Sequence, residues 1–111
     1  MASEAECERA LRSVVDALAA VEPEVRRKYV VDRTVSCRVS DLDVTWFAHL
    51  TDDGLVGMSK DGTKAQVRLT VGSDDLLLLV SGKLAVPTAV ATGRVRVQAS
   101  PFDLLRLSAF L

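Results

Sequence analysis

The sequence predicts an α+β fold in a single domain. Residues 3–22 repeat apolar side chains at helical spacing, whereas five later segments alternate apolar and polar residues as strands do. Two segments in the C-terminal half, 73–82 and 100–111, are apolar on more than one face, which is typical of helices covered on two sides. The 111 residues suit one core of ordinary size, so we expect one domain over 1–111.

The N-terminal helix is predicted over about 3–22 and ends before Pro23. Ser3 is followed three residues later by Glu6, the spacing of a capping box that satisfies the first backbone amides of a helix. The apolar residues then recur at steps of three and four, at Cys7, Leu11, Val14, Leu18 and Val21. This pattern predicts one apolar face that packs against the rest of the domain.

Five strands are predicted, over 31–39, 44–50, 55–58, 65–71 and 94–99. Thr51-Asp52-Asp53-Gly54 and Lys60-Asp61-Gly62 supply turn residues between neighbouring strands. Trp46 and Phe47 stand side by side in the second strand, and both are large and apolar. The register of this strand at Trp46-Phe47 is therefore ambiguous from the sequence.

The segment 73–82 is predicted to be a helix. Ser73 can cap it, Asp74 and Asp75 suit the positive end of the helix dipole, and Gly82 can take the left-handed stop position. A buried strand is the alternative, because periodicity does not separate the two in a short apolar run. Ser100-Pro101 can open a terminal helix as cap and first-turn proline.

Composition and motifs exclude several classes of function. A net charge of -1 argues against a nucleic-acid partner. The chain has one histidine, His49, no glycine-rich phosphate loop, and two cysteines without metal-site spacing. We therefore expect no catalytic residues, no metal and no cofactor, and we interpret the protein as a non-enzyme.

The chain is expected to be cytoplasmic, because its acidic N-terminus is no signal peptide and no apolar run is long enough to span a membrane. Arg26-Arg27-Lys28 allows transient contact with a membrane surface, although three basic residues usually form a solvated face. The absence of Ile and Asn, with ten Arg against four Lys, favours a GC-rich bacterial genome.

The apolar excess of the two C-terminal segments has two interpretations. A cavity between such helices would hold a water-insoluble ligand by burial of apolar area. The same surfaces would serve equally in a filled core or in an interface with a second copy of the chain. The residues alone leave both open.

The order of motifs from about residue 32 onward resembles the sterol carrier protein type 2 (SCP-2) family. Ser81-Gly82-Lys83-Leu84 is similar to the family's turn, and Ala89 follows after a four-residue spacer. Gly93 with Arg94-Val95-Arg96-Val97 is similar to the glycine and strand that come next, and Trp46 stands where the second strand often carries tryptophan. Val90 departs from the family's large aromatic residue, which alters the expected pocket wall.

The resemblance implies a stand-alone bacterial family member with a five-stranded, mostly antiparallel twisted sheet. Helices would pack on one face, with an apolar tunnel between sheet and helices. It also implies non-covalent binding or transfer of a hydrophobic ligand, namely a sterol, fatty acid or acyl-CoA. The alternative is a protein interaction or homodimerisation module that uses the same apolar helices. The expected ligand-binding residues are Trp46, Leu69, Leu77, Leu78, Leu84, Val90, Phe102, Leu105 and Phe110.

Overall fold

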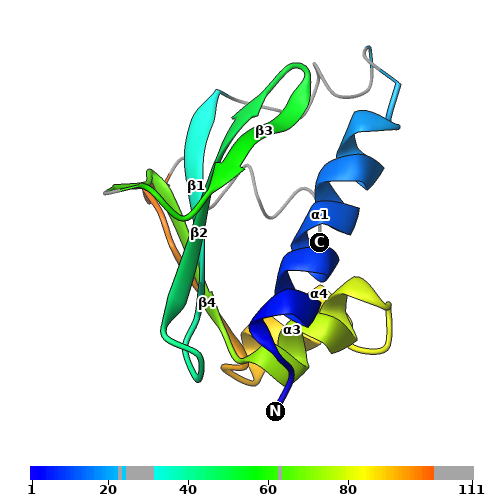
Figure 1. The fold of residues 1–111 in the computed structure, drawn as a ribbon, viewed down its shortest axis with the longest axis vertical. Helices are drawn as coiled ribbons and strands as arrows, with labels where there is room; N and C mark the ends of the chain where they lie inside the picture. The colour runs from blue at the N-terminus through cyan, green and yellow to red at the C-terminus, as the bar shows by residue number, and fades with distance from the viewer. Residues whose placement is uncertain (23, 25–31, 63, 102–111) are drawn as a thin grey trace.

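One sheet carries helices on a single face in the computed structural model, which describes residues 1–22, 24, 32–62 and 64–101 (Figure 1). The elements in chain order are α1 (Glu4–Ala19), β1 (Arg33–Val39), β2 (Val44–Thr51), β3 (Gly54–Ser59), β4 (Val67–Val71), α3 (Ser73–Val80), α4 (Val86–Ala91) and β5 (Val95–Gln98). The five predicted strands are thus present to within two residues at each end. The predicted terminal helix falls outside the described residues, apart from its first two positions.

The sheet has the strand order β3-β2-β1-β4-β5. Its β1–β2, β2–β3 and β4–β5 pairs are antiparallel, and only β1–β4 is parallel. Short turns join the antiparallel neighbours of the first three strands, so β4 has to cross over to reach the free edge of β1. The mostly antiparallel α+β fold is confirmed, with α1, α3 and α4 on the same side of the sheet (Figure 1).

Helix α1 starts with the predicted capping box. The Ser3 hydroxyl accepts a hydrogen bond from the Glu6 amide at 3.1 Å, and the Glu6 carboxylate accepts one from the Ser3 amide at 3.2 Å. The helix buries Cys7 and Ala10, and α1 packs against α3 and β3. It therefore forms the wall opposite the sheet.

The register of β2 is resolved in favour of an inward Trp46. This residue is only 3% exposed and pairs across the antiparallel ladder with buried Cys37. Its neighbour Phe47 occupies the alternate position, and its ring lies so close to Gly62 that a Cβ on Gly62 would overlap it. The pairing of β2 with β3 also shifts between Phe47 and His49, an irregularity that alternation alone does not predict.

The segment predicted over 73–82 forms a helix, α3 (Ser73–Val80), and not a strand, but the expectation that Ser73 caps it is wrong. Gly72 is the N-cap residue, and Ser73 is the first residue of α3. The cap comes from the β1–β2 turn, where the Asp41 carboxylate accepts hydrogen bonds from the Ser73 amide at 2.8 Å and the Ser73 hydroxyl at 2.5 Å. The fully buried Ser73 hydroxyl also accepts a hydrogen bond from the Ala2 amide. One serine thus joins the N-terminus, a sheet turn and a helix.

Asp41→Asn should lower the melting temperature at neutral pH. It should also make the melting temperature change less with pH in the acidic range. The hydrogen bonds from Ser73 hold the pKa of the Asp41 carboxyl below its ordinary value of 3.8. A depressed folded-state pKa stabilises the fold above pH 3.8, and this stabilisation is lost as pH falls through the folded pKa. Thermal unfolding followed by circular dichroism at neutral and acidic pH measures both effects. The matched control is Asp52→Asn in the exposed β2–β3 turn; an equal effect there would contradict the prediction.

Helix α4 was not predicted from the sequence. Pro87 stands in its first turn, and Gly93, with a φ of 76°, follows its end. Proline at a helix start and glycine just past its end are together a helix signal. The segment is only six residues long, so hydrophobic periodicity has little length in which to appear.

Candidate functional site

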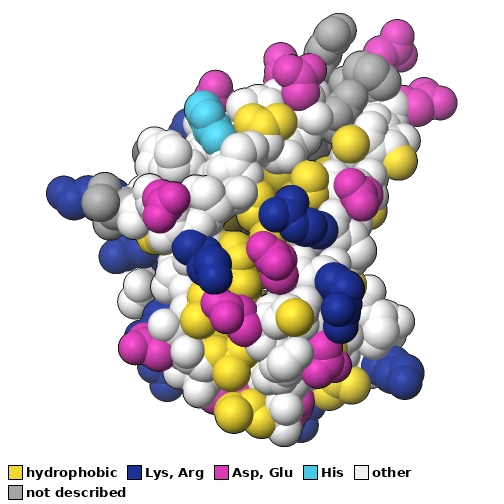
Figure 2. Space-filling model, viewed as in Figure 1, with side chains coloured by type: hydrophobic (Ala, Val, Ile, Leu, Met, Phe, Trp, Pro, Cys, Tyr) yellow, Lys and Arg dark blue, Asp and Glu magenta, His cyan; other side chains and the backbone are white. Residues whose placement is uncertain are grey.

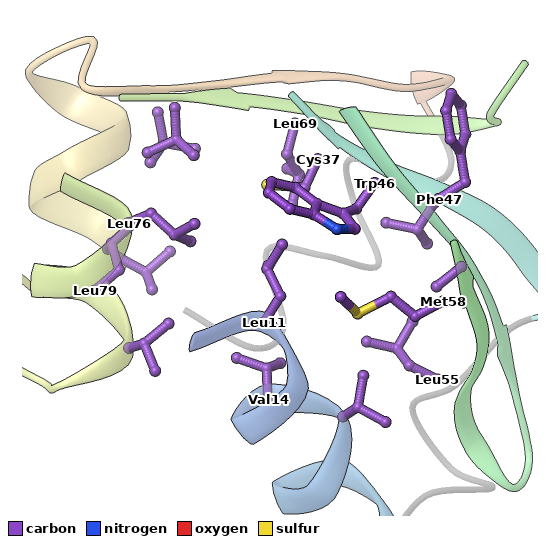
Figure 3. Close-up of a pocket in the computed structure, with 17 residues that line it drawn as sticks. Leu11, Val14, Cys37, Trp46, Phe47, Leu55, Met58, Leu69, Leu76 and Leu79 are labelled. Atoms are coloured by element: carbon purple, nitrogen blue, oxygen red, sulfur yellow. The ribbon is translucent and has the colours of Figure 1, made fainter. Parts of the chain in front are cut away.

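An apolar pocket of about 290 Å³ lies between the sheet and helices α1 and α3 (Figure 3). The sheet supplies its floor, α1 the opposite wall, and α3 with the start of α4 closes one end. The described lining residues are Leu11, Val14, Val15, Val35, Cys37, Trp46, Phe47, Ala48, Leu55, Met58, Leu69, Val71, Leu76, Leu79, Val80, Val86 and Val95.

The wall is chemically uniform. None of these lining side chains carries a charge or a hydroxyl, and their only heteroatoms are the two sulfurs of Cys37 and Met58 and the indole nitrogen of Trp46. On the face shown in Figure 2, apolar side chains are visible between the sheet and the helices, bordered by charged side chains of both signs. Such a pocket binds through burial of apolar area, at about 25 cal/mol per Å².

Alternation in the strands and helical spacing in α1 together build this wall. Val35 and Cys37 are two residues apart on β1, so both point to the same face of the sheet. Leu11, Val14 and Val15 stand at steps of three and four on α1, and so lie on one helix face. The sheet face and the helix face thus meet across the pocket.

The leucine run of α3 divides between two surroundings. Leu76, Leu79 and Val80 line the pocket. Leu77 instead lines a shallow groove between α1 and α3, where it lies with Glu6 and other α1 residues. Helix α3 is apolar on more than one face because one side lines the pocket and another packs against α1, as the sequence pattern indicated.

The predicted ligand-binding residues are distributed over several places. Trp46 and Leu69 line the pocket. Leu77 lines the groove described above, Leu78 is half-buried against the core, and Leu84 is buried in it. Val90 lies on α4 and is 40% exposed. Phe102, Leu105 and Phe110 lie outside the described residues.

Sequence reasoning missed the contribution of α1 and β3 to the wall. Leu11, Val14 and Val15 come from α1, and Leu55 and Met58 come from β3. The signal was present in the spacing of the α1 residues, which places them on one apolar face. That spacing does not say whether the face meets a core or a cavity.

The single histidine of the sequence lies away from the pocket. His49 lies outside the pocket lining and contacts the Asp32 carboxylate at an exposed position. Within the described ranges, no three His, Cys, Asp or Glu side chains form a group that would hold a metal ion. Asp74 and Asp75 occupy the first turn of α3, as predicted.

Both cysteine thiols should react slowly with a disulfide reagent such as Ellman's reagent at neutral pH until the protein is unfolded. Cys7 and Cys37 are free and buried, and burial raises the pKa of both, that of Cys37 to about 11. Thiolate is the reactive form, so little of it is present at neutral pH. Unfolding in guanidinium chloride provides the control, because both thiols should then react fast. A thiol that reacts at the free rate in native protein would contradict this prediction.

The described helices include none that combines the length and the apolar character required to cross a bilayer. The basic cluster Arg26-Arg27-Lys28, considered above for membrane contact, lies outside the described residues.

Comparison with solved structures finds the same fold in lipid carriers and in part of an enzyme. Sterol carrier protein 2 like 2 from Aedes aegypti has a TM-score of 0.71 at 17% identity, covering 96% of this chain and 97% of that chain. The Aedes aegypti sterol carrier protein 2 complex with palmitate has a TM-score of 0.68 at 19% identity, over 99% and 96%. The sec-alkylsulfatase Pisa1 from Pseudomonas sp. has a TM-score of 0.62 at 22% identity, over 81% of this chain but 14% of that chain.

No curated protein matches the sequence. The SCP-2 sterol transfer family matches residues 15–111, which span every described element except most of α1. The similar structures thus include sterol carrier proteins and a sulfatase in which the matched part is 14% of that chain. With this match over most of the sequence, and with the sheet and helices in the arrangement of the Aedes aegypti carriers, the chain belongs to the SCP-2 sterol transfer family.

Proposed function

We propose that this protein binds or transfers a single hydrophobic ligand, a sterol, fatty acid or acyl-CoA, without covalent chemistry. The observation that carries the proposal is the pocket of about 290 Å³ whose described lining side chains are uncharged and lack hydroxyls. This volume lies just below the usual range of ligand pockets, roughly 300–1,000 Å³. It favours one slender aliphatic group. The palmitate complex of the similar Aedes aegypti protein supports the same ligand class.

Delipidation followed by titration with cis-parinaric acid, a fluorescent fatty acid, tests the proposal. We expect saturable binding of one probe per chain, and displacement of the probe by unlabelled fatty acid or sterol. Mass spectrometry of organic extracts from protein that has not been delipidated identifies the ligand carried from the cell. A protein that binds no probe and yields an empty extract would overturn the proposal.

A protein interaction or homodimerisation module is the alternative function. Val86 and Val90 of α4 are 46% and 40% exposed and stand four residues apart, so they share one helix face. A second copy of the chain would cover this face. Light scattering coupled to size-exclusion chromatography tests this alternative: a monomer mass at all concentrations contradicts it. A dimer that Val90→Asp dissociates without loss of probe binding supports it.

A further inference from the structure

The indole of Trp46 is the one strong hydrogen-bond donor among the described side chains of the pocket wall. The residue is 3% exposed, and its Nε1 atom is buried without a hydrogen-bond partner in the described part of the chain. Figure 3 shows the nitrogen edge of the ring turned towards the space that Leu11 and Met58 border. The N–H therefore points to the pocket side of the wall, where neighbouring side chains cover the nitrogen, and a ligand oxygen has to displace part of this cover to reach it.

An unpaired donor at this position is unusual. Buried polar atoms in proteins nearly all have a hydrogen-bond partner, and tryptophan N–H groups usually find one when buried. The other heteroatoms of the described lining side chains are the sulfurs of Cys37 and Met58, which are weak acceptors. A bound molecule that places an oxygen in the pocket would satisfy the donor.

We propose that the Trp46 N–H donates a hydrogen bond to a neutral oxygen of the bound lipid, so that the pocket prefers an oxygenated lipid to the matching hydrocarbon. This inference rests on the proposed function and narrows its ligand class. The acceptor is a carbonyl or hydroxyl oxygen, as in a long-chain ketone, an ester, an acyl thioester or a sterol.

The charge of the wall decides between a neutral and an ionised acceptor. A buried carboxylate requires a cation or several donors to compensate for the loss of water. The described lining holds no Lys, Arg or His, and a single indole N–H supplies only one hydrogen bond. A fatty-acid carboxylate is therefore disfavoured beside Trp46, and such a ligand would keep its headgroup away from this site.

The experiment compares three probes of equal chain length: dodecane, 2-dodecanone and dodecanoate. Trp46 is the only tryptophan in the sequence, so the ¹⁵N-labelled protein gives one indole N–H signal. The ketone should move the indole proton downfield, whereas dodecane and dodecanoate should bind without this shift. Binding of all three probes with no ketone-specific shift would overturn the inference and leave the proposed function standing. If none of the three probes binds, both the inference and the proposed function are wrong.

Two substitutions of Trp46 distinguish the loss of its hydrogen bond from a change in the shape of its side chain. Trp46→Phe, and replacement of the single tryptophan by β-(3-benzothienyl)alanine, both remove the N–H, and the second keeps the bicyclic shape. Each should weaken binding of 2-dodecanone about tenfold, the value of one net hydrogen bond, while dodecane binding changes by less than about twofold. Equal losses for ketone and hydrocarbon in the benzothienyl protein would contradict a hydrogen bond. That protein gives the answer even if Trp46→Phe fails to fold.

Discussion

Leu79→Trp should raise the dissociation constant for cis-parinaric acid about a hundredfold, a loss of about 2.7 kcal/mol of binding free energy. Leu79 lies on α3 and points into the pocket, where Figure 3 shows it beside Leu76. An indole at this position would occupy space that an aliphatic ligand needs. The pocket holds only about 290 Å³, so there is little room for ligand and indole together.

Leu77→Trp is the matched control, because it makes the same change two residues earlier on the same helix. Leu77 is half-buried but lines the groove beside Glu6, outside the pocket. Its probe affinity should stay within about threefold of the wild-type value, which is below 1 kcal/mol. Thermal unfolding of both variants verifies that each remains folded, since an added large side chain can cost about 1–3 kcal/mol of stability. Equal loss of binding in both variants would contradict the assignment of the pocket.

Much of the fold could be predicted from local patterns. Alternation located the five strands, and the Ser3–Glu6 capping box located the start of α1. The failures have long-range causes. Ser73 looks like a cap in the sequence, but an aspartate 32 residues earlier performs that role, because the fold brings the β1–β2 turn to the start of α3. The sequence around Ser73 carries no information about this contact between the β1–β2 turn and α3.

The pocket was harder to predict than the fold. Leu77 and Leu79 belong to one leucine run and have similar burial, yet only Leu79 lines the pocket. Whether an apolar side chain borders a cavity or fills the core depends on the volume left after all elements pack. Hydrophobic periodicity indicates which face of a helix or strand is buried, but it does not indicate how much volume remains unfilled beside that face. Trp46 and Leu69 were among the predicted ligand-binding residues, and both line the pocket. Leu11 and Val14 of α1 also line it, but their spacing indicated only a buried helix face.

Leu76→Ala should lower the free energy of unfolding by about 3 kcal/mol, in the range for a buried leucine that leaves a cavity. Leu76 is 5% exposed and belongs to the hydrophobic core while also bordering the pocket. Urea denaturation of delipidated protein measures the loss. Leu77→Ala is the control, because its half-buried side chain removes less apolar contact and should cost about 1 kcal/mol. A loss at Leu76 no larger than at Leu77 would contradict its place in the core.

The same variant should keep its ability to bind lipid, which separates it from Leu79→Trp. Removing Leu76 enlarges the pocket, whereas the indole at 79 fills it, so the two substitutions should act in opposite directions on the space for ligand. A ligand that binds only the folded state at a hundred times its Kd stabilises that state by about 2.7 kcal/mol. Fatty acid at this concentration should therefore restore most of the stability that Leu76→Ala loses, but it should stabilise Leu79→Trp by only about 0.4 kcal/mol, because the Kd of that variant is about a hundredfold higher. If fatty acid stabilised both variants equally, the ligand would have to bind elsewhere than between the sheet and α3.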